Sequence, residues 1–183
     1  MTMSDLRVIT PQAILSYPNL FEPRENQQGK LVYSAELVFT SGTDLSDMKA
    51  AATAAAREQW GSNVPKGIRT PFDDRWEQFN YPGDSIFVRT NTQSAPGIVV
   101  GPKRTICTEP AEFYAGAIVI AELTARAYDV SGSRGVKFFL NNIWKIRDGE
   151  PLVKGHSVAD TFAGVELDAD AFGDASATAD SLL

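Results

Sequence analysis

Hydrophobic and polar residues alternate along much of this chain, which is typical of strands with one face buried in a β-sheet. The alternation is clearest at residues 31–39 and in two longer runs, 117–128 and 136–147. Shorter runs of the same kind occur at residues 7–15, 85–90 and 98–100. The segment 131–135 between the two long runs reads Ser-Gly-Ser-Arg-Gly, so it predicts the turn of a β-hairpin.

Prolines interrupt the pattern after the first of these runs. Residues 16–23 contain Pro18 and Pro23. Because proline cannot donate to a strand ladder, we expect these residues to end the first strand. A polar hairpin loop is then expected over residues 22–30.

Residues 44–60 change to a helical spacing. Small and apolar residues recur every three to four positions, Thr43 or Asp44 can cap the start, and Gly61 can end the helix. The run 117–128 has a face of small residues, which would let this helix pack closely on the sheet.

These elements predict a mainly β fold with five to seven strands, mostly antiparallel, and one helix inserted between the early and late strands. An OB-fold-like antiparallel β-barrel fits this inventory, because closure removes edge strands and leaves a curved face for a ligand. A β-sandwich is the alternative. We expect one domain over residues 1–157 and a disordered acidic tail over residues 158–183.

Charge separates the predicted body from the tail. Six of the 23 acids follow Lys154, while the 17 acids before it balance all 17 Lys and Arg residues. The net charge of −6 therefore belongs to the tail, and an acidic overall balance does not exclude a body that binds nucleic acid. The tail is either a solvated solubility tail or an appendage that competes for a cationic surface.

Few catalytic arrangements are available to this chain. It has one cysteine, Cys107, and one histidine, His156, and it lacks the glycine-rich phosphate-binding motifs. We expect no cofactor and no metal site. A metal-dependent nuclease using Asp129, Asp148 and Glu150 remains a less favoured alternative. No apolar run is long enough to span a bilayer and no secretion signal is recognisable, so we expect the protein to stay in the compartment where it is made.

The last strand carries a candidate binding face. In strict alternation Lys137, Phe139, Asn141, Ile143, Lys145 and Arg147 share one side. Arg126 and Tyr128 can extend this side across the hairpin, and Arg134 lies at its turn. Cations along a groove with aromatic rings between them are what single-stranded nucleic acid requires. The alternative is that Phe139 belongs to the core and the charges line a solvated face.

The loop-like residues 61–83 hold a second set of aromatic and basic side chains, including Trp76. Long loops of this kind are often functional, but their aromatic side chains can also plug the flank of a domain. The sequence leaves both interpretations open.

Several motifs resemble those of a family of tailed-phage single-stranded-DNA-binding proteins. They are the blocks 113–117, 127–136 and 140–152, with the early segments 17–23 and 30–35. The most specific block is Leu140-Asn141-Asn142 through Arg147-Asp148-Gly149-Glu150. Residues 73–80 are bulkier than the short polar segment expected in that family, so the resemblance leaves the groove wall open.

The resemblance implies an OB-fold that binds single-stranded DNA without sequence preference during phage replication or recombination, in the cytoplasm of the infected bacterium. We then expect Phe139, Tyr128 and Trp76 to stack on bases. The phosphate contacts would come from Arg126, Arg134, Lys137, Lys145 and Arg147. The acidic tail, with Asp168, Asp170, Phe172 and Asp174, would recruit a phage DNA polymerase or helicase, and the protein could form a homo-oligomer. A structural protein of virion assembly is the alternative of a different class.

Overall fold

A computed structural model describes residues 6–152 and 164–165 of the chain. Its elements follow one another in the order β1 (Arg7–Ile9), β2 (Ala13–Glu25), β3 (Leu31–Phe39), α1 (Ser46–Trp60), β4 (Phe72–Asp73), the 3₁₀ turn η2 (Trp76–Phe79), β5 (Ile86–Thr92), β6 (Gly97–Val100), β7 (Thr105–Ile106), the 3₁₀ turn η3 (Pro110–Glu112), β8 (Ile118–Val130) and β9 (Ser133–Arg147). The predicted boundary at residue 157 lies outside the described residues.

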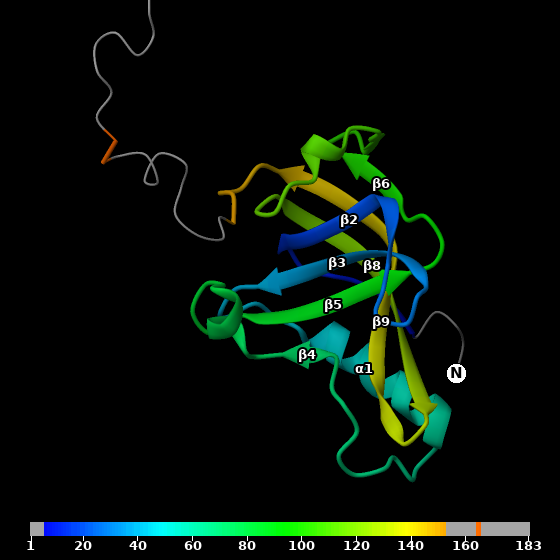
Figure 1. The fold of residues 1–183 in the computed structure, drawn as a ribbon. Coiled ribbons are helices and arrows are strands. Elements are labelled where there is room, and N and C mark those ends of the chain that lie inside the picture. Colours follow the sequence, from blue (N-terminus) through cyan, green and yellow to red (C-terminus); the bar gives the residue numbers. More distant parts are fainter. Residues whose placement is uncertain (1–5, 153–163, 166–183) are drawn as a thin grey trace, which may run out of the picture. The chain divides into compact units, whose positions relative to one another are not determined.

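Five of the described strands form a closed circuit of pairings (Figure 1). The path runs β8-β2-β3-β5-β9, and β9 pairs again with β8 to complete the ring. Most of these pairings are antiparallel, but β9 lies parallel to β5 and also to β6. A five-stranded, partly closed barrel of this kind is the arrangement of an OB-fold, so the predicted fold class is confirmed.

The core fills the barrel and the space beneath α1. The buried face of α1 consists of Met48, Ala51, Ala52, Ala55 and Ala56. This face packs mainly against β8, where Ala121, Leu123 and Ala125 are almost fully buried. Small residues on both surfaces let the helix approach the sheet closely, as the sequence predicts. Gly61 ends the helix, and Asp44 accepts a hydrogen bond from the Ser46 amide at its start.

The predicted break at residues 16–23 is wrong, because β2 continues through both prolines to Glu25. The pairing of β2 with β3 shifts register between Ser16 and Asn19 and again between Asn19 and Arg24. Tyr17 adopts a positive φ of 44° at the first shift. Irregularities of this kind leave positions that need not donate to the ladder, so a long strand can accommodate Pro18 and Pro23.

Candidate nucleic-acid interface

The β8–β9 hairpin brings four of the predicted site residues together, Arg126, Tyr128, Lys137 and Phe139, which we call the hairpin patch. Arg126 pairs in register with Lys137, and Phe139 pairs with Thr124. The Lys137 Nζ lies 4.7 Å from the Phe139 ring centroid and 5.8 Å from that of Tyr128. The two cations are exposed and the two rings are half-buried. The patch therefore offers charge and ring surface on one outer face.

Lys145 does not belong to this face, and its predicted position there is wrong. Leu123 pairs with Leu140 whereas Glu122 pairs with Asn142, so β9 has one extra residue at this point. Such a bulge reverses the alternation beyond it. Ile143 and Lys145 consequently point to the buried side, and Lys145 is only 6% exposed.

The Lys145 ammonium is held by two carboxylates. Its Nζ lies 2.6 Å from Glu112 Oε2 and 2.6 Å from Asp148 Oδ1. Desolvation disfavours the charged ammonium, but the hydrogen bonds to Asp148 and Glu112 outweigh it and raise the pKa of Lys145. The hydrogen bond from Lys145 lowers the pKa of Asp148 in turn. This lysine ties the end of β9 to the η3 turn.

The remaining predicted cations lie at the two ends of β9. Arg134 is exposed beside the hairpin turn, where its Nε lies 3.0 Å from Asp129 Oδ2. Arg147 is exposed at the far end, where it pairs in register with Ile118. Arg134 is thus partly neutralised, and Arg147 is separated from the hairpin patch by the length of the strand.

Trp76 lies in a different aromatic cluster. It packs against Val38, Tyr81 and Phe87 on the outer face of β3 and β5. Phe139 instead lies beside Asn91, four residues beyond Phe87 along β5. Four residues of strand span about 13 Å. The structure therefore does not bring Trp76 together with the hairpin patch.

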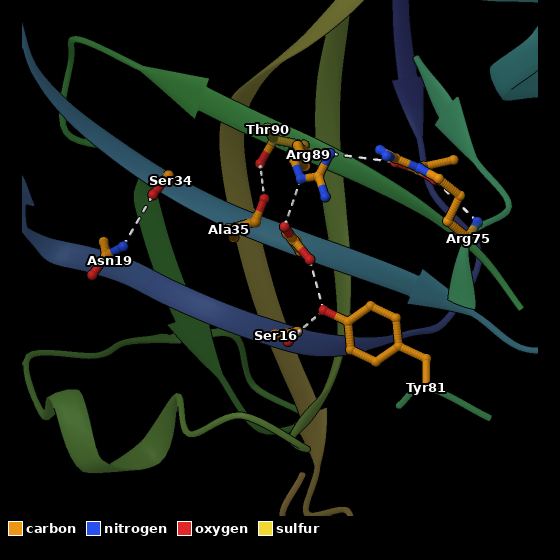
Figure 2. Close-up of polar contacts among 10 residues, drawn as sticks. Ser16, Asn19, Ser34, Ala35, Arg75, Tyr81, Arg89 and Thr90 are labelled. Atoms are coloured by element: carbon orange, nitrogen blue, oxygen red, sulfur yellow. Dashed lines mark hydrogen bonds and ion pairs between the residues drawn. The ribbon is translucent and has the colours of Figure 1, made fainter. Parts of the chain in front are cut away.

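A polar network holds this aromatic segment on the barrel (Figure 2). The Tyr81 hydroxyl donates to Glu36 Oε2 at 2.6 Å, and it is hydrogen-bonded to Ser16 Oγ at 2.8 Å. Burial and the bond to Glu36 raise the pKa of Tyr81. Arg89 donates to Glu36 Oε1 at 2.8 Å, and its guanidinium carbon lies 5.1 Å from the Phe79 ring centroid. The aromatic residues of 72–81 thus cover the flank of the barrel.

Residues 67–75, which we call the loop wall, line one side of an open cleft of about 630 Å³, which we call the basic cleft. Arg89 of β5 and Val136 and Lys137 of β9 also line the cleft, and two acids, Asp73 and Asp74, belong to its lining. Arg69 and Arg75 enter from the loop, and because Lys137 also belongs to the hairpin patch, the two surfaces are continuous. The sequence indicated basic residues in this loop but not that they face β9.

Ion pairs divide the cations of the basic cleft and the hairpin patch into two groups. Arg75 is bound in a bidentate manner by Asp73, at 2.6 and 2.9 Å, and this contact lowers the pKa of Asp73. Arg89 is shared between Glu36 and Asp73. Within the described part of the chain, Arg69, Arg126 and Lys137 form no ion pair. These three have the charge that is most available to an anionic ligand.

Backbone contacts fix the position of Arg69. Its amide donates to the Arg134 carbonyl at 2.8 Å, and its carbonyl accepts from the Val136 amide at 3.0 Å. A Cβ atom on Gly135 would lie 2.7 Å from the Arg69 carbonyl oxygen and 2.7 Å from the Tyr128 hydroxyl. Only glycine allows this approach, so residue 135 sets the distance between the loop wall and the hairpin patch.

Two of the three acids of the nuclease alternative, Asp129 and Asp148, are engaged in ion pairs. Asp129 pairs with Arg134 and Asp148 with Lys145. No group of three His, Cys, Asp or Glu side chains suited to a metal ion occurs among residues 6–152 and 164–165. In the same residues, no helix is long and apolar enough to cross a membrane.

Comparison with known proteins identifies a family for this chain. A family model described as "Enterobacter phage Enc34, ssDNA-binding protein" matches residues 6–172. The chain belongs to this family. Membership confirms the resemblance seen in the sequence, and it places the chain among binding proteins rather than enzymes. No curated protein matches the chain.

Two solved structures show how widely the fold is shared. The single-stranded DNA-binding protein from bacteriophage Enc34, in complex with ssDNA, is 17% identical with a TM-score of 0.68, over 81% of this chain and 90% of that chain. The protein gp2.5, a single-stranded DNA-binding protein encoded by bacteriophage T7, is 12% identical with a TM-score of 0.62, over 87% and 94%. At these identities the similarity concerns the fold.

Proposed function

We propose that this protein coats single-stranded DNA without sequence preference during phage replication or recombination, in the cytoplasm of the infected bacterium. The observation that carries the proposal is the continuity of the basic cleft with the hairpin patch. Unpaired cations lie beside half-buried aromatic rings on one outer surface of an OB-fold. Phosphates need the cations and unstacked bases need the rings, and neither contact distinguishes one base from another.

Each side chain has a stated role in this proposal. Phe139 and Tyr128 stack on bases, while Arg69, Arg126 and Lys137 contact phosphates. Arg75, Arg134 and Arg147 add weaker phosphate contacts at the margins, because carboxylates neutralise the first two and Arg147 is distant. Trp76 supports the wall of the cleft instead of stacking. Lys145 is left out because two carboxylates hold it.

The acidic tail has a regulatory role in the same proposal. Asp168, Asp170, Phe172 and Asp174 lie outside the described residues. Their sequence combines acids with one aromatic side chain, the two groups that the cleft and patch are suited to bind. The tail competes with DNA for the cationic surface and, once displaced, is free to recruit a polymerase or helicase.

Charge neutralisation tests the DNA path. The double variant Arg126→Gln/Lys137→Gln removes two phosphate contacts, so the dependence of log K on log salt for oligo-dT becomes shallower by about 1.4, at roughly 0.7 for each contact. The control is Lys103→Gln/Arg24→Gln, which makes the same charge change at two exposed residues away from the cleft. An equal loss of slope in both double variants would mean that net charge, and not this surface, governs binding.

A further inference from the structure

A largely apolar pocket adjoins the basic cleft and shares the segment 68–72 with it. It has a volume of about 990 Å³ and is formed between α1 and the segment that follows it, which we call the helix pocket. Ala52 and Ala56 of α1 face Val64, Ile68 and Phe72 of that segment, and Val136 completes the lining. In Figure 1, α1 (cyan) continues into this segment (teal) before the chain reaches β4.

The rim of the helix pocket is cationic. Lys49, Thr53 and Arg57 are spaced four residues apart, so they share one face of α1, and Arg69 also lines the pocket. No Asp or Glu lines this pocket. Arg57 and Arg69 form no ion pair within the described part of the chain. The acids of the helix, Asp47 and Glu58, do not line it.

An apolar lining under a cationic rim fits an acidic peptide better than a nucleic acid. A bound base would need an aromatic face for stacking, but the lining has one ring, Phe72, and this ring already packs in a T-shaped pair with Phe138, with the centroids 5.8 Å apart. A peptide can instead place one apolar side chain against the alanines and the aliphatic residues while its carboxylates reach Lys49 and Arg57, which do not line the basic cleft. Charge-assisted contacts of this kind are stronger than neutral ones.

We propose that the helix pocket docks an acidic peptide segment of a partner protein, with one apolar side chain as its anchor. The pocket and the basic cleft share the segment 68–72 and Val136, but the α1 residues line only the pocket, while Arg75, Arg89 and Lys137 line only the cleft. In this proposal a partner is held on the α1 side while DNA occupies the cleft. This goes beyond the coating function, because it assigns a second, protein-binding surface to the body of the molecule.

The test uses the full-length chain and a short fluorescein-labelled peptide of alternating Asp and Ala residues with one central Phe. Fluorescence anisotropy is expected to show salt-sensitive binding that weakens when the central Phe becomes Ala. Arg57→Glu is expected to weaken binding about tenfold or more, since it reverses a rim charge. Lys103→Glu makes the same charge change at an exposed residue outside the pocket and is expected to bind the peptide normally.

Four outcomes would overturn the proposal. They are the absence of binding to any form of the chain, equal binding by Arg57→Glu, displacement of the peptide by saturating oligo-dT, and binding only after Asp168, Asp170, Phe172 and Asp174 are neutralised in the full chain. The third would assign the pocket to the DNA path, and the fourth to the chain's own acidic segment. Oligo-dT affinity, measured in parallel, separates failure of this proposal from failure of the DNA-binding function.

Discussion

At the scale of single residues, two adjacent phenylalanines have opposite environments. Phe138 is 1% exposed in the core, whereas Phe139 is half-buried in the hairpin patch. We expect Phe139→Ala to weaken oligo-dT binding by about 1–3 kcal/mol, the value of one stacked base, with little change in the free energy of unfolding. We expect Phe138→Ala to cost about 3–5 kcal/mol of stability because it leaves a cavity.

Anisotropy and urea denaturation of both variants measure the two effects. If Phe139→Ala lost stability and affinity in the same proportion, Phe139 would be a core residue. The sequence alone left these roles open, because alternation does not show which side of a strand faces the barrel.

Lys145 and Lys137 form a second contrasting pair. We expect Lys145→Met to keep oligo-dT affinity within about twofold and to lower stability at neutral pH, because the carboxylates of Asp148 and Glu112 lose their partner. Lys137→Met is expected to weaken oligo-dT binding and to leave the stability nearly unchanged. A loss of DNA affinity by Lys145→Met at unchanged stability would contradict this assignment.

The pH dependence of the Lys145 contribution follows from the two pKa shifts. The pKa of Asp148 is lowered, so its stabilisation is present above the ordinary value of 3.8 and is lost as pH falls through the lower folded value. The pKa of Lys145 is raised, so its stabilisation is present below the ordinary value of 10.5 and is lost as pH rises through the folded value. Between these two pH limits, urea denaturation should show a lower free energy of unfolding for Lys145→Met than for the unmodified chain.

At the scale of elements, the loop wall depends on one glycine. We expect Gly135→Ala to push the Arg69 segment away from β9, costing about 1–3 kcal/mol of stability through overpacking, and to weaken oligo-dT binding because Arg69 moves. Gly83→Ala is the control, because its Cβ would meet only Trp76 Cη2, at 4.0 Å. Full DNA affinity in a destabilised Gly135→Ala variant would show that the wall is not part of the binding surface.

Element boundaries were predicted well where the alternation was regular and less well where it was interrupted. The strand at residues 31–39 and the helix were predicted correctly or within two residues. The long β2 and the reversal of faces in β9 were missed, since both depend on bulges that a period-two pattern does not contain. A bulge is decided by the partner strand, which one segment of sequence does not show.

The motifs that carry the family resemblance include structural contacts as well as candidate binding residues. Tyr114 donates to the Gly149 carbonyl at 2.8 Å, and the Leu152 amide donates to the Ala115 carbonyl at 2.9 Å. Together with Lys145 and its two carboxylates, these bonds join the end of β9 to the turn before β8. Part of the most specific sequence block therefore serves folding. Because Lys145 of this block is buried, the cationic face is smaller than the sequence predicts.

At the scale of the whole molecule, the neutral body and acidic tail predict an electrostatic competition. We expect truncation after Ala163 to tighten oligo-dT binding, most strongly at low salt, because charge attraction is least screened there. Titrations of the full and truncated chains at low and physiological salt measure the effect. Equal affinities at both salt concentrations would contradict competition by the tail.

The central claim is that the basic cleft and the hairpin patch bind single-stranded DNA. It is tested most directly by an anisotropy titration of labelled oligo-dT at two salt concentrations, with duplex DNA as competitor. The account predicts tight, salt-dependent binding of oligo-dT. Duplex DNA is expected to be a poor competitor, because paired bases do not expose their faces to Phe139 and Tyr128. Absence of binding, even with the tail removed, would contradict the account and favour a role in virion assembly.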